Sequence, residues 1–89
     1  MIAIYKYPFD VNDYVDLQFP KDGKILKVEC QNGNPCAWVM VDTNNEDKIR
    51  TFKIYGTGHI IRKDHIRHLT HIATFQQGSF VWHMFEVKK

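Results

Sequence analysis

Short runs of alternating apolar and polar residues, each closed by a turn signal, dominate this sequence. The run YVDLQF at 14–19 places Val15, Leu17 and Phe19 on one side of an extended chain and polar side chains on the other. This period of two is typical of a half-buried β-strand. The following PKDG (20–23) predicts a turn, because proline presets φ and glycine accepts a positive φ. The pattern predicts antiparallel sheet.

The same pattern recurs along the chain and predicts six or seven strands. The expected segments are 2–7, 14–19, 24–31, 36–43, 48–55, 70–76 and 80–87. Two of them, 36–43 and 80–87, are apolar on both faces, so we expect central strands or strands with a covered outer face. The Asn32-Gly33 pair favours a tight hairpin. Short strands joined by short turns predict a mainly β fold, as a single small antiparallel β-sandwich or barrel.

The segment RKDHIRHLTHI (62–72) departs from this alternation. Its apolar residues Ile66, Leu69 and Ile72 are three apart, which permits one short helix around 63–70. Three histidines at the same spacing could gather on a metal ion if the segment is helical; they are His65, His68 and His71. Metal sites on helices more often use a spacing of four, and no cysteine or carboxylate joins at a recognised interval. We therefore expect solvated or capping histidines and no metal site.

The length and composition indicate one ordered domain, residues 1–89. A chain of 89 residues has no room for a second core. Its 44% apolar and 13% aromatic content excludes a disordered chain. A core of this size gives modest stability, and a homo-oligomer or a bound ligand would be a natural further source. We expect a homo-oligomer.

The charge distribution limits the classes of partner. The net charge is +2 and the basic residues are dispersed, which is too little for a nucleic-acid-binding stripe. The opening MIAIYKYPFDV contains a lysine and no long apolar run, so we expect neither a signal peptide nor a membrane span. These features predict a cytoplasmic protein.

Two cysteines flank the expected hairpin. A hairpin centred on Gly33 would set Cys30 and Cys36 opposite each other, where a cross-strand disulfide is conceivable. Without an export signal, buried free thiols are the favoured interpretation. No CxxC or other zinc spacing is present.

The block Tyr55-Gly56-Thr57-Gly58-His59 follows a good strand and allows two interpretations. Alternating glycines can expose consecutive backbone N–H groups in a concave nest that binds an anion. The tyrosine would then offer a stacking surface and the histidine a polar contact. The glycine spacing matches neither a Rossmann fingerprint nor a P-loop. The alternative is a bulge and tight turn in which only glycine meets the backbone requirements.

The last expected strand holds a second block of rings, FVWHMFE. Trp82 and Glu86 share one face of this strand, and His83 and Phe85 share the other. A histidine and a glutamate among rings could act as acid and base, but no nucleophile, paired carboxylate or cofactor motif accompanies them. We therefore expect neither catalysis nor a cofactor. Rings that are not buried would form a binding surface.

Four pieces of the sequence, in order over nearly the whole chain, resemble a family of small bacteriophage and prophage proteins of unknown function. These pieces are IYKYPF, GKILKVECQNGNPCAWVMVD, RTFKIYGTGHII and HIATFQQGSFVWHMFE. The most recognisable parts are the YGTGH and FVWHxFE blocks. In that family a proline commonly follows the histidine of the first block, whereas Ile60 stands there in this chain. The resemblance favours the ligand-loop interpretation, because a plain turn seldom needs its tyrosine and histidine as well as its glycines.

The functional hypothesis is a small phage-type accessory protein, a non-catalytic binding module acting in the cytoplasm of the host bacterium against its defences. It would sequester a small anionic, nucleotide-like ligand in a pocket where the two blocks meet on adjacent strands. The expected ligand-binding residues are Tyr55, Gly56, Thr57, Gly58, His59, Trp82, His83 and Glu86. Two alternatives remain: a protein-binding inhibitor of a bacterial defence complex, of anti-CRISPR type, and a virion or assembly component.

Overall fold

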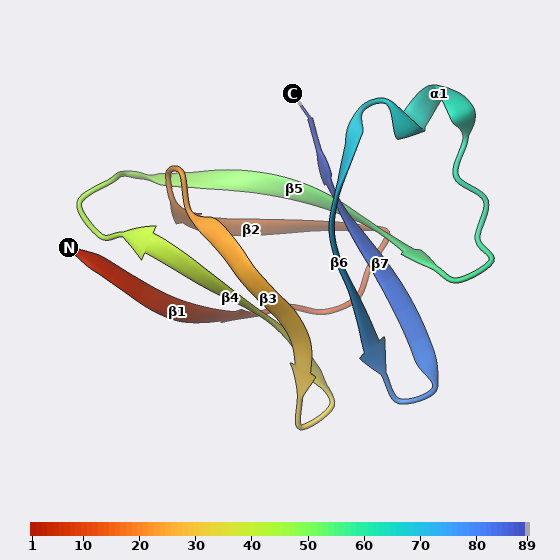
Figure 1. Ribbon diagram of the computed structural model, residues 1–89, viewed down its shortest axis with the longest axis horizontal. Helices are drawn as coiled ribbons and strands as arrows, with labels where there is room; N and C mark the ends of the chain where they lie inside the picture. Colours follow the sequence, from red (N-terminus) through yellow and green to blue (C-terminus); the bar gives the residue numbers. More distant parts are fainter. Residues whose placement is uncertain (89) are drawn as a thin grey trace.

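A computed structural model describes residues 1–88 and contains seven strands and one helical turn (Figure 1). The elements are β1 (Ile2–Pro8), β2 (Tyr14–Pro20), β3 (Lys24–Gln31), β4 (Asn34–Asp42), β5 (Asp47–Gly56), α1 (Lys63–Ile66), β6 (Leu69–Gln77) and β7 (Phe80–Val87). The predicted mainly β fold is confirmed, and the helix is shorter than the segment that the spacing permits. Among the described residues, no helix has the length and apolar character needed to cross a membrane.

The strands form two antiparallel sheets. The first sheet has the order β1-β4-β3, and the second has the order β2-β5-β7-β6. The chain therefore passes between the sheets at the β1–β2, β2–β3 and β4–β5 connections. The edge strands β3 and β6 come into contact with each other, and Gln77 Nε2 donates a hydrogen bond to the carbonyl of Gly33 across this edge at 3.2 Å. The three chain crossings and the contact between β3 and β6 hold the two sheets together.

The core lies between the two sheets, and its buried residues come from β2 to β7, at alternate positions where a strand supplies more than one. The second sheet contributes the β2 side chains that alternation predicted, Val15, Leu17 and Phe19. The other buried members of the cluster are Val28, Ala37, Val39, Val41, Phe52, Ile54, Phe75 and Met84. Within residues 1–88 no polar or charged residue is buried. Burial of each large apolar side chain contributes about 1.5–3 kcal/mol, so this cluster supplies most of the stability.

The β3–β4 hairpin confirms the predicted Asn32-Gly33 turn and separates the two cysteines. Both turn residues have positive φ, 53° and 82°, as a type I′ turn requires. This turn sets Cys30 opposite Pro35 rather than opposite Cys36, so the expected facing of the two thiols is wrong. An offset of one residue places side chains on opposite faces of a sheet. Both thiols are free.

The turn after β2 forms as predicted, but its glycine has a different role. The Gly23 N–H donates to the carbonyl of Pro20 at 3.1 Å, while the positive φ of 66° belongs to Asp22. A Cβ on Gly23 would lie 2.6 Å from Phe19 Cδ1 and 3.0 Å from Val39 Cγ1. The residue is glycine because its backbone lies against the core.

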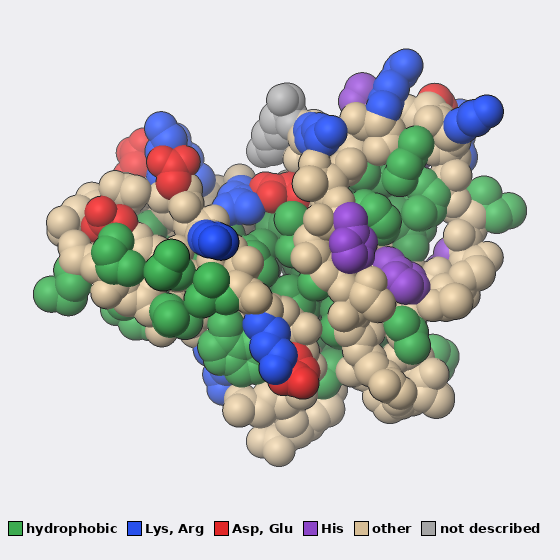
Figure 2. Space-filling view, in the orientation of Figure 1, with side chains coloured by type: hydrophobic (Ala, Val, Ile, Leu, Met, Phe, Trp, Pro, Cys, Tyr) green, Lys and Arg blue, Asp and Glu red, His purple; other side chains and the backbone are tan. Residues whose placement is uncertain are grey.

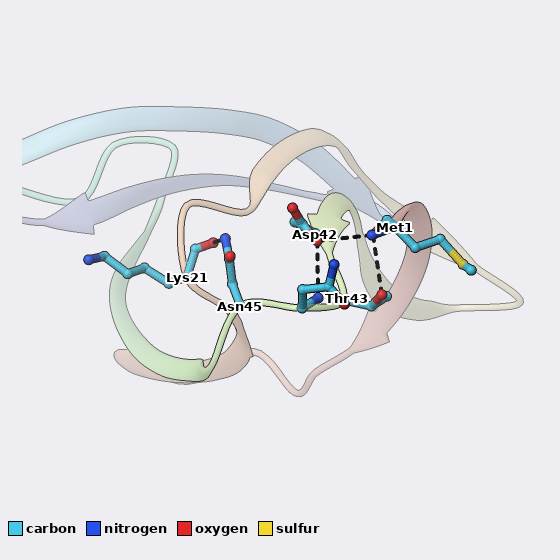
Figure 3. Close-up of polar contacts among 6 residues, drawn as sticks. Met1, Lys21, Asp42, Thr43 and Asn45 are labelled. Carbon is cyan, nitrogen blue, oxygen red and sulfur yellow. Dashed lines mark hydrogen bonds and ion pairs between the residues drawn. The ribbon is translucent and has the colours of Figure 1, made fainter.

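The loop between β4 and β5 ties three parts of the chain together (Figure 3). Asp42 Oδ1 accepts hydrogen bonds from the amino group of Met1 at 3.2 Å and from the N–H of Asn44 at 3.0 Å. Asn45 Nδ2 donates to the carbonyl of Lys21 at 2.9 Å. The N–H of Asn44, followed by the ammonium group, lowers the pKa of the Asp42 carboxyl. The loop thereby joins β1, β4 and the β2–β3 turn.

Candidate functional site

Strands β5 and β7 are neighbours in the second sheet and bring the two predicted blocks together. Gly56 lies opposite Trp82, and Tyr55 lies opposite His83. Because side chains alternate along a strand, Trp82 and Glu86 are on the face of β7 toward the core, and His83 is on the outer face. The predicted site residues are therefore neighbours on paired strands, but they lie on two different faces of the sheet.

The glycine block forms a turn in which the backbone N–H groups of Gly56, Thr57 and His59 are already hydrogen-bonded. The N–H of Gly56 donates to Nδ1 of His59 at 3.0 Å. The N–H of Thr57 donates to the carbonyl of Val81 at 3.2 Å, and that of His59 donates to the carbonyl of Gly56 at 3.1 Å. The expected anion nest of consecutive free amides is therefore wrong.

The two glycines of this turn have different physical roles. Gly58 has a φ of 88°, as the third position of a type II turn requires. Gly56 does not have a positive φ, but a Cβ on it would lie 3.0 Å from His59 Cε1 and 3.2 Å from Trp82 Cζ3. One glycine makes the turn, and the other lets two rings approach the backbone.

A surface hollow of about 400 Å³ opens where this turn meets the β6–β7 hairpin. It is lined by Gly56, Thr57, His59, Ser79, Phe80, Val81 and Trp82. The rings of Phe80 and Trp82 stack with centroids 5.6 Å apart and planes 22° apart, and Phe80 is 61% exposed. Trp82 Nε1 donates to Gln77 Oε1 at 3.1 Å. The hollow thus presents an aromatic wall whose indole N–H is already satisfied.

The bond from Gly56 fixes the tautomer of the neutral His59 ring. Because Nδ1 accepts that N–H, the ring proton lies on Nε2, which is then a donor. Among the described residues, none that lines the hollow is a lysine or an arginine. The hollow therefore combines ring surface with one directional donor and lacks a permanent cation.

His83 lies outside the hollow, in a row of imidazoles and hydroxyls across the outer face of the second sheet. Its Nε2 is 2.7 Å from Thr57 Oγ1, and its Nδ1 is 3.0 Å from Thr74 Oγ1. Thr74 Oγ1 is also 3.1 Å from His71 Nε2. Figure 2 shows histidine side chains at the surface over β6 and β7. Both nitrogens of the His83 ring are thus engaged by hydroxyl groups.

Glu86 is held away from the hollow by an arginine. Its two carboxylate oxygens accept hydrogen bonds from Nε and Nη2 of Arg50 at 2.6 and 2.7 Å. Arg50 also donates through Nη1 to the carbonyl of Gly23 at 2.6 Å and lies over the Phe19 ring at 5.0 Å. Glu86 is therefore one half of an ion pair that covers one end of the core.

A second pocket, of about 140 Å³, lies between α1 and the outer face of the second sheet. It is lined by Tyr14, Lys53, Tyr55, His65, His68, Leu69 and Val87. Tyr55, a predicted site residue, is 8% exposed, and its burial, followed by the charges of Tyr14 and Asp13, raises the pKa of its hydroxyl. Sequence reasoning missed Lys53; the available signal was its position two residues before Tyr55, on the same face of β5.

Comparison with protein-family models matches residues 1–89 to a domain of unknown function, DUF7352. The chain belongs to the DUF7352 family. The resemblance to a family of unknown function is thereby confirmed. Comparison with curated proteins and with solved structures found no match.

In this DUF7352 domain the predicted residues fall into three groups. Gly56, Thr57, His59 and Trp82 line the hollow, and Gly58 shapes its turn. Tyr55 and His83 lie on the outer face, and Glu86 pairs with Arg50. Sequence reasoning missed Ser79, Phe80 and Val81 as lining residues. Within residues 1–88 no group of three or more His, Cys, Asp or Glu is placed to hold a metal ion.

Proposed function

We propose that this DUF7352 domain is a non-catalytic binding module that sequesters a small nucleotide-like ligand through the ligand's planar ring. The observation that supports this function is the convergence of three rings, His59, Phe80 and Trp82, on one hollow. Stacking of a base on an aromatic side chain contributes about 1–3 kcal/mol. Nε2–H of His59 supplies a donor that orients a ring carrying acceptor atoms.

The contacts of the hollow support recognition of the ligand's base rather than of its phosphate. The N–H groups of Gly56, Thr57 and His59 are bonded within the domain, and the lining carries no permanent cation. Protonation of His59 at Nδ1 would break its bond from Gly56. An anionic group on the ligand therefore extends toward solvent in this proposal.

The resemblance to phage and prophage proteins gives the proposal its biological setting. A small module that binds a signalling nucleotide lowers the free concentration of that nucleotide without chemistry. In this proposal the domain acts in the cytoplasm of the host bacterium as a homo-oligomer, and it counters a nucleotide-dependent defence.

Thermal denaturation with nucleoside monophosphates and cyclic dinucleotides tests this function. Binding at a hundred times Kd stabilises a protein by about 2.7 kcal/mol, so at least one ligand of the panel should raise the Tm. Phe80→Ala should abolish the shift, whereas Tyr5→Ala should preserve it, because Tyr5 is a 50% exposed ring on the other sheet. No shift with any ligand at millimolar concentration would contradict the proposal.

The outward face of the first sheet supports a second candidate function, binding to a protein. On this face Ile4 pairs with Met40, and Lys24 flanks Met40 on the other side. Ile2 and Leu26 are also exposed, at 63% and 46%. Figure 2 shows hydrophobic side chains gathered over the first sheet with basic side chains beside them. An inhibitor of a bacterial defence complex would use such a face against an acidic surface with an apolar centre.

A complex with a purified acidic defence protein distinguishes the two candidates. The inhibitor requires a stoichiometric complex that added salt weakens and that Ile4→Glu abolishes, while Phe80→Ala leaves the complex intact. If Phe80→Ala abolished the complex and Ile4→Glu left it intact, the hollow, and not the first sheet, would be the favoured binding surface. Recovery of the domain in purified phage particles would instead favour a virion or assembly component.

A further inference from the structure

We propose that the pocket beneath α1 is a binding site for a small oxyanion, distinct from the ring-lined hollow. Three separate parts of the chain supply its polar and aromatic lining. Tyr14 comes from β2, Lys53 and Tyr55 come from β5, and His65 and His68 come from α1 and the segment that follows it. The pocket lies on the outer face of the second sheet, whereas Trp82 lies on the face of β7 toward the core.

The ammonium group of Lys53 lacks a close oxygen acceptor among the described residues. Its side chain is 18% exposed, and its one ion pair among the described residues is with Asp13, at 3.9 Å. The Asp13 side chain is 90% exposed, so its carboxylate neutralises the ammonium weakly. The ammonium instead lies 4.6 Å from the Tyr14 ring centroid and 5.1 Å from that of Tyr55. Ring faces attract a cation, but its N–H donors still need oxygen acceptors.

Hydrogen bonds hold the histidine wall of the pocket in place. The N–H of His68 donates to the carbonyl of His65 at 2.9 Å, and the N–H of Lys88 donates to the carbonyl of His68 at 2.7 Å. Nε2 of His68 accepts from Nε of Arg67 at 3.3 Å, so the proton of the neutral ring is on Nδ1. The backbone is thereby fixed, and the imidazole retains a donor.

The charge and size of the pocket select the class of ligand. Its lining contains a lysine and no carboxylate, which disfavours a metal ion or an organic cation. Its volume of about 140 Å³ is below the roughly 300 Å³ at which pockets for larger organic ligands begin. An inorganic phosphate, or one phosphate group of a larger molecule, would receive charge-assisted hydrogen bonds from Lys53 and further donors from the tyrosines and histidines.

Titration of the whole domain with inorganic phosphate at constant ionic strength tests the site, with chloride as the reference anion. We expect saturable shifts of the His65 and His68 imidazole signals in the NMR spectrum with phosphate and not with chloride. Lys53→Met should weaken phosphate binding about ten-fold or more, because it removes the charge-assisted donor. Lys48→Gln is the matched control, since Lys48 lies on the same strand, is 54% exposed and pairs with Glu46; we expect less than a two-fold change.

Additional variants and a second ligand distinguish loss of this site from loss of folding or loss of the hollow. If Lys53→Met does not fold, His68→Gln replaces it and should weaken phosphate binding, while Lys48→Gln again should not. Phe80→Ala should leave phosphate binding unchanged, so failure of the hollow and failure of this site are separable. Adenosine monophosphate that shifts these histidines in the Phe80→Ala variant would identify the nucleotide's phosphate as a source of the anion. Equal shifts with chloride, or equal phosphate binding by the Lys53→Met variant, would overturn the proposal.

Discussion

Nδ1 of His59 accepts the backbone N–H of Gly56 at 3.0 Å, and the same glycine lies opposite Trp82 on the neighbouring strand. The imidazole therefore takes the position that an anion would occupy in a backbone nest. This contact turns the glycine block from a source of donors into a support for two rings.

Gly56→Ala should move the His59 and Trp82 rings apart. The added Cβ would lie 3.0 Å from His59 Cε1, so we expect about 1–3 kcal/mol of destabilisation and a shift in Trp82 fluorescence. Gly58→Ala is the control, because its Cβ meets nothing within 4 Å and its cost comes from the φ of 88°. It should lower stability without altering the Trp82 emission. Urea denaturation followed by fluorescence measures both effects, and equal spectra for the two variants would contradict the assignment.

Gly23→Ala should destabilise the domain through the core. The new Cβ would lie 2.6 Å from the Phe19 ring, so we expect an overpacking cost of about 1–3 kcal/mol in the free energy of unfolding. Gly33→Asn is the control, because Gly33 has positive φ and open space, and asparagine tolerates that conformation. Chemical denaturation compares the two. A larger loss for Gly33→Asn than for Gly23→Ala would show that Gly23 is retained for another reason.

The Arg50–Glu86 pair should contribute to stability and not to ligand binding. The two side chains are 26% and 24% exposed, so solvent reduces the value of the bidentate bond, and we expect a coupling energy of about 1 kcal/mol. A double-mutant cycle with Arg50→Met and Glu86→Gln measures it. Glu86→Gln should leave nucleotide affinity within two-fold of the parent. A large loss of affinity at unchanged stability would return Glu86 to the binding site.

Stability should fall at alkaline pH because of Tyr55. Burial, followed by the charges of Tyr14 and Asp13, raises its pKa above the ordinary 10.0. The unfolded chain then loses this proton at a lower pH than the folded domain does. The stability that the buried, neutral Tyr55 hydroxyl contributes is therefore complete below pH 10.0 and is lost as the pH rises through the folded-state pKa. Urea denaturation across this range should show a shallower loss for Tyr55→Phe, and an identical pH dependence would contradict the burial effect.

The local sequence pattern was sufficient to predict most of the fold. The alternation of Val15, Leu17 and Phe19 fixed which face of β2 is buried, since a period of two leaves one choice of face. Asn32-Gly33 specified its hairpin, because few other pairs accept positive φ at both positions. The separation of Cys30 from Cys36 followed from the loop length of that hairpin, which the glycine position alone does not determine.

The site depended on contacts that sequence spacing does not encode. The bond between Gly56 and His59 requires the ring to fold back over its own turn, and a glycine pattern cannot reveal this rotamer. The pairing of Glu86 with Arg50 joins residues 36 apart in the chain. The pocket around Lys53 exists because the segment after β5 returns across the outer face. Contacts between residues that are distant in the sequence are therefore the part of the site that the sequence could not predict.

The NMR signals of the Trp82 indole N–H and of the Gly56 backbone N–H, recorded during a nucleotide titration, test the central claim most directly. If the ligand's ring stacks in the hollow, both signals should shift saturably with one ligand of the panel. The Trp38 indole signal, from a strand of the other sheet, should stay in place. Unmoved Trp82 and Gly56 signals with every nucleotide at millimolar concentration would contradict ring recognition at this site.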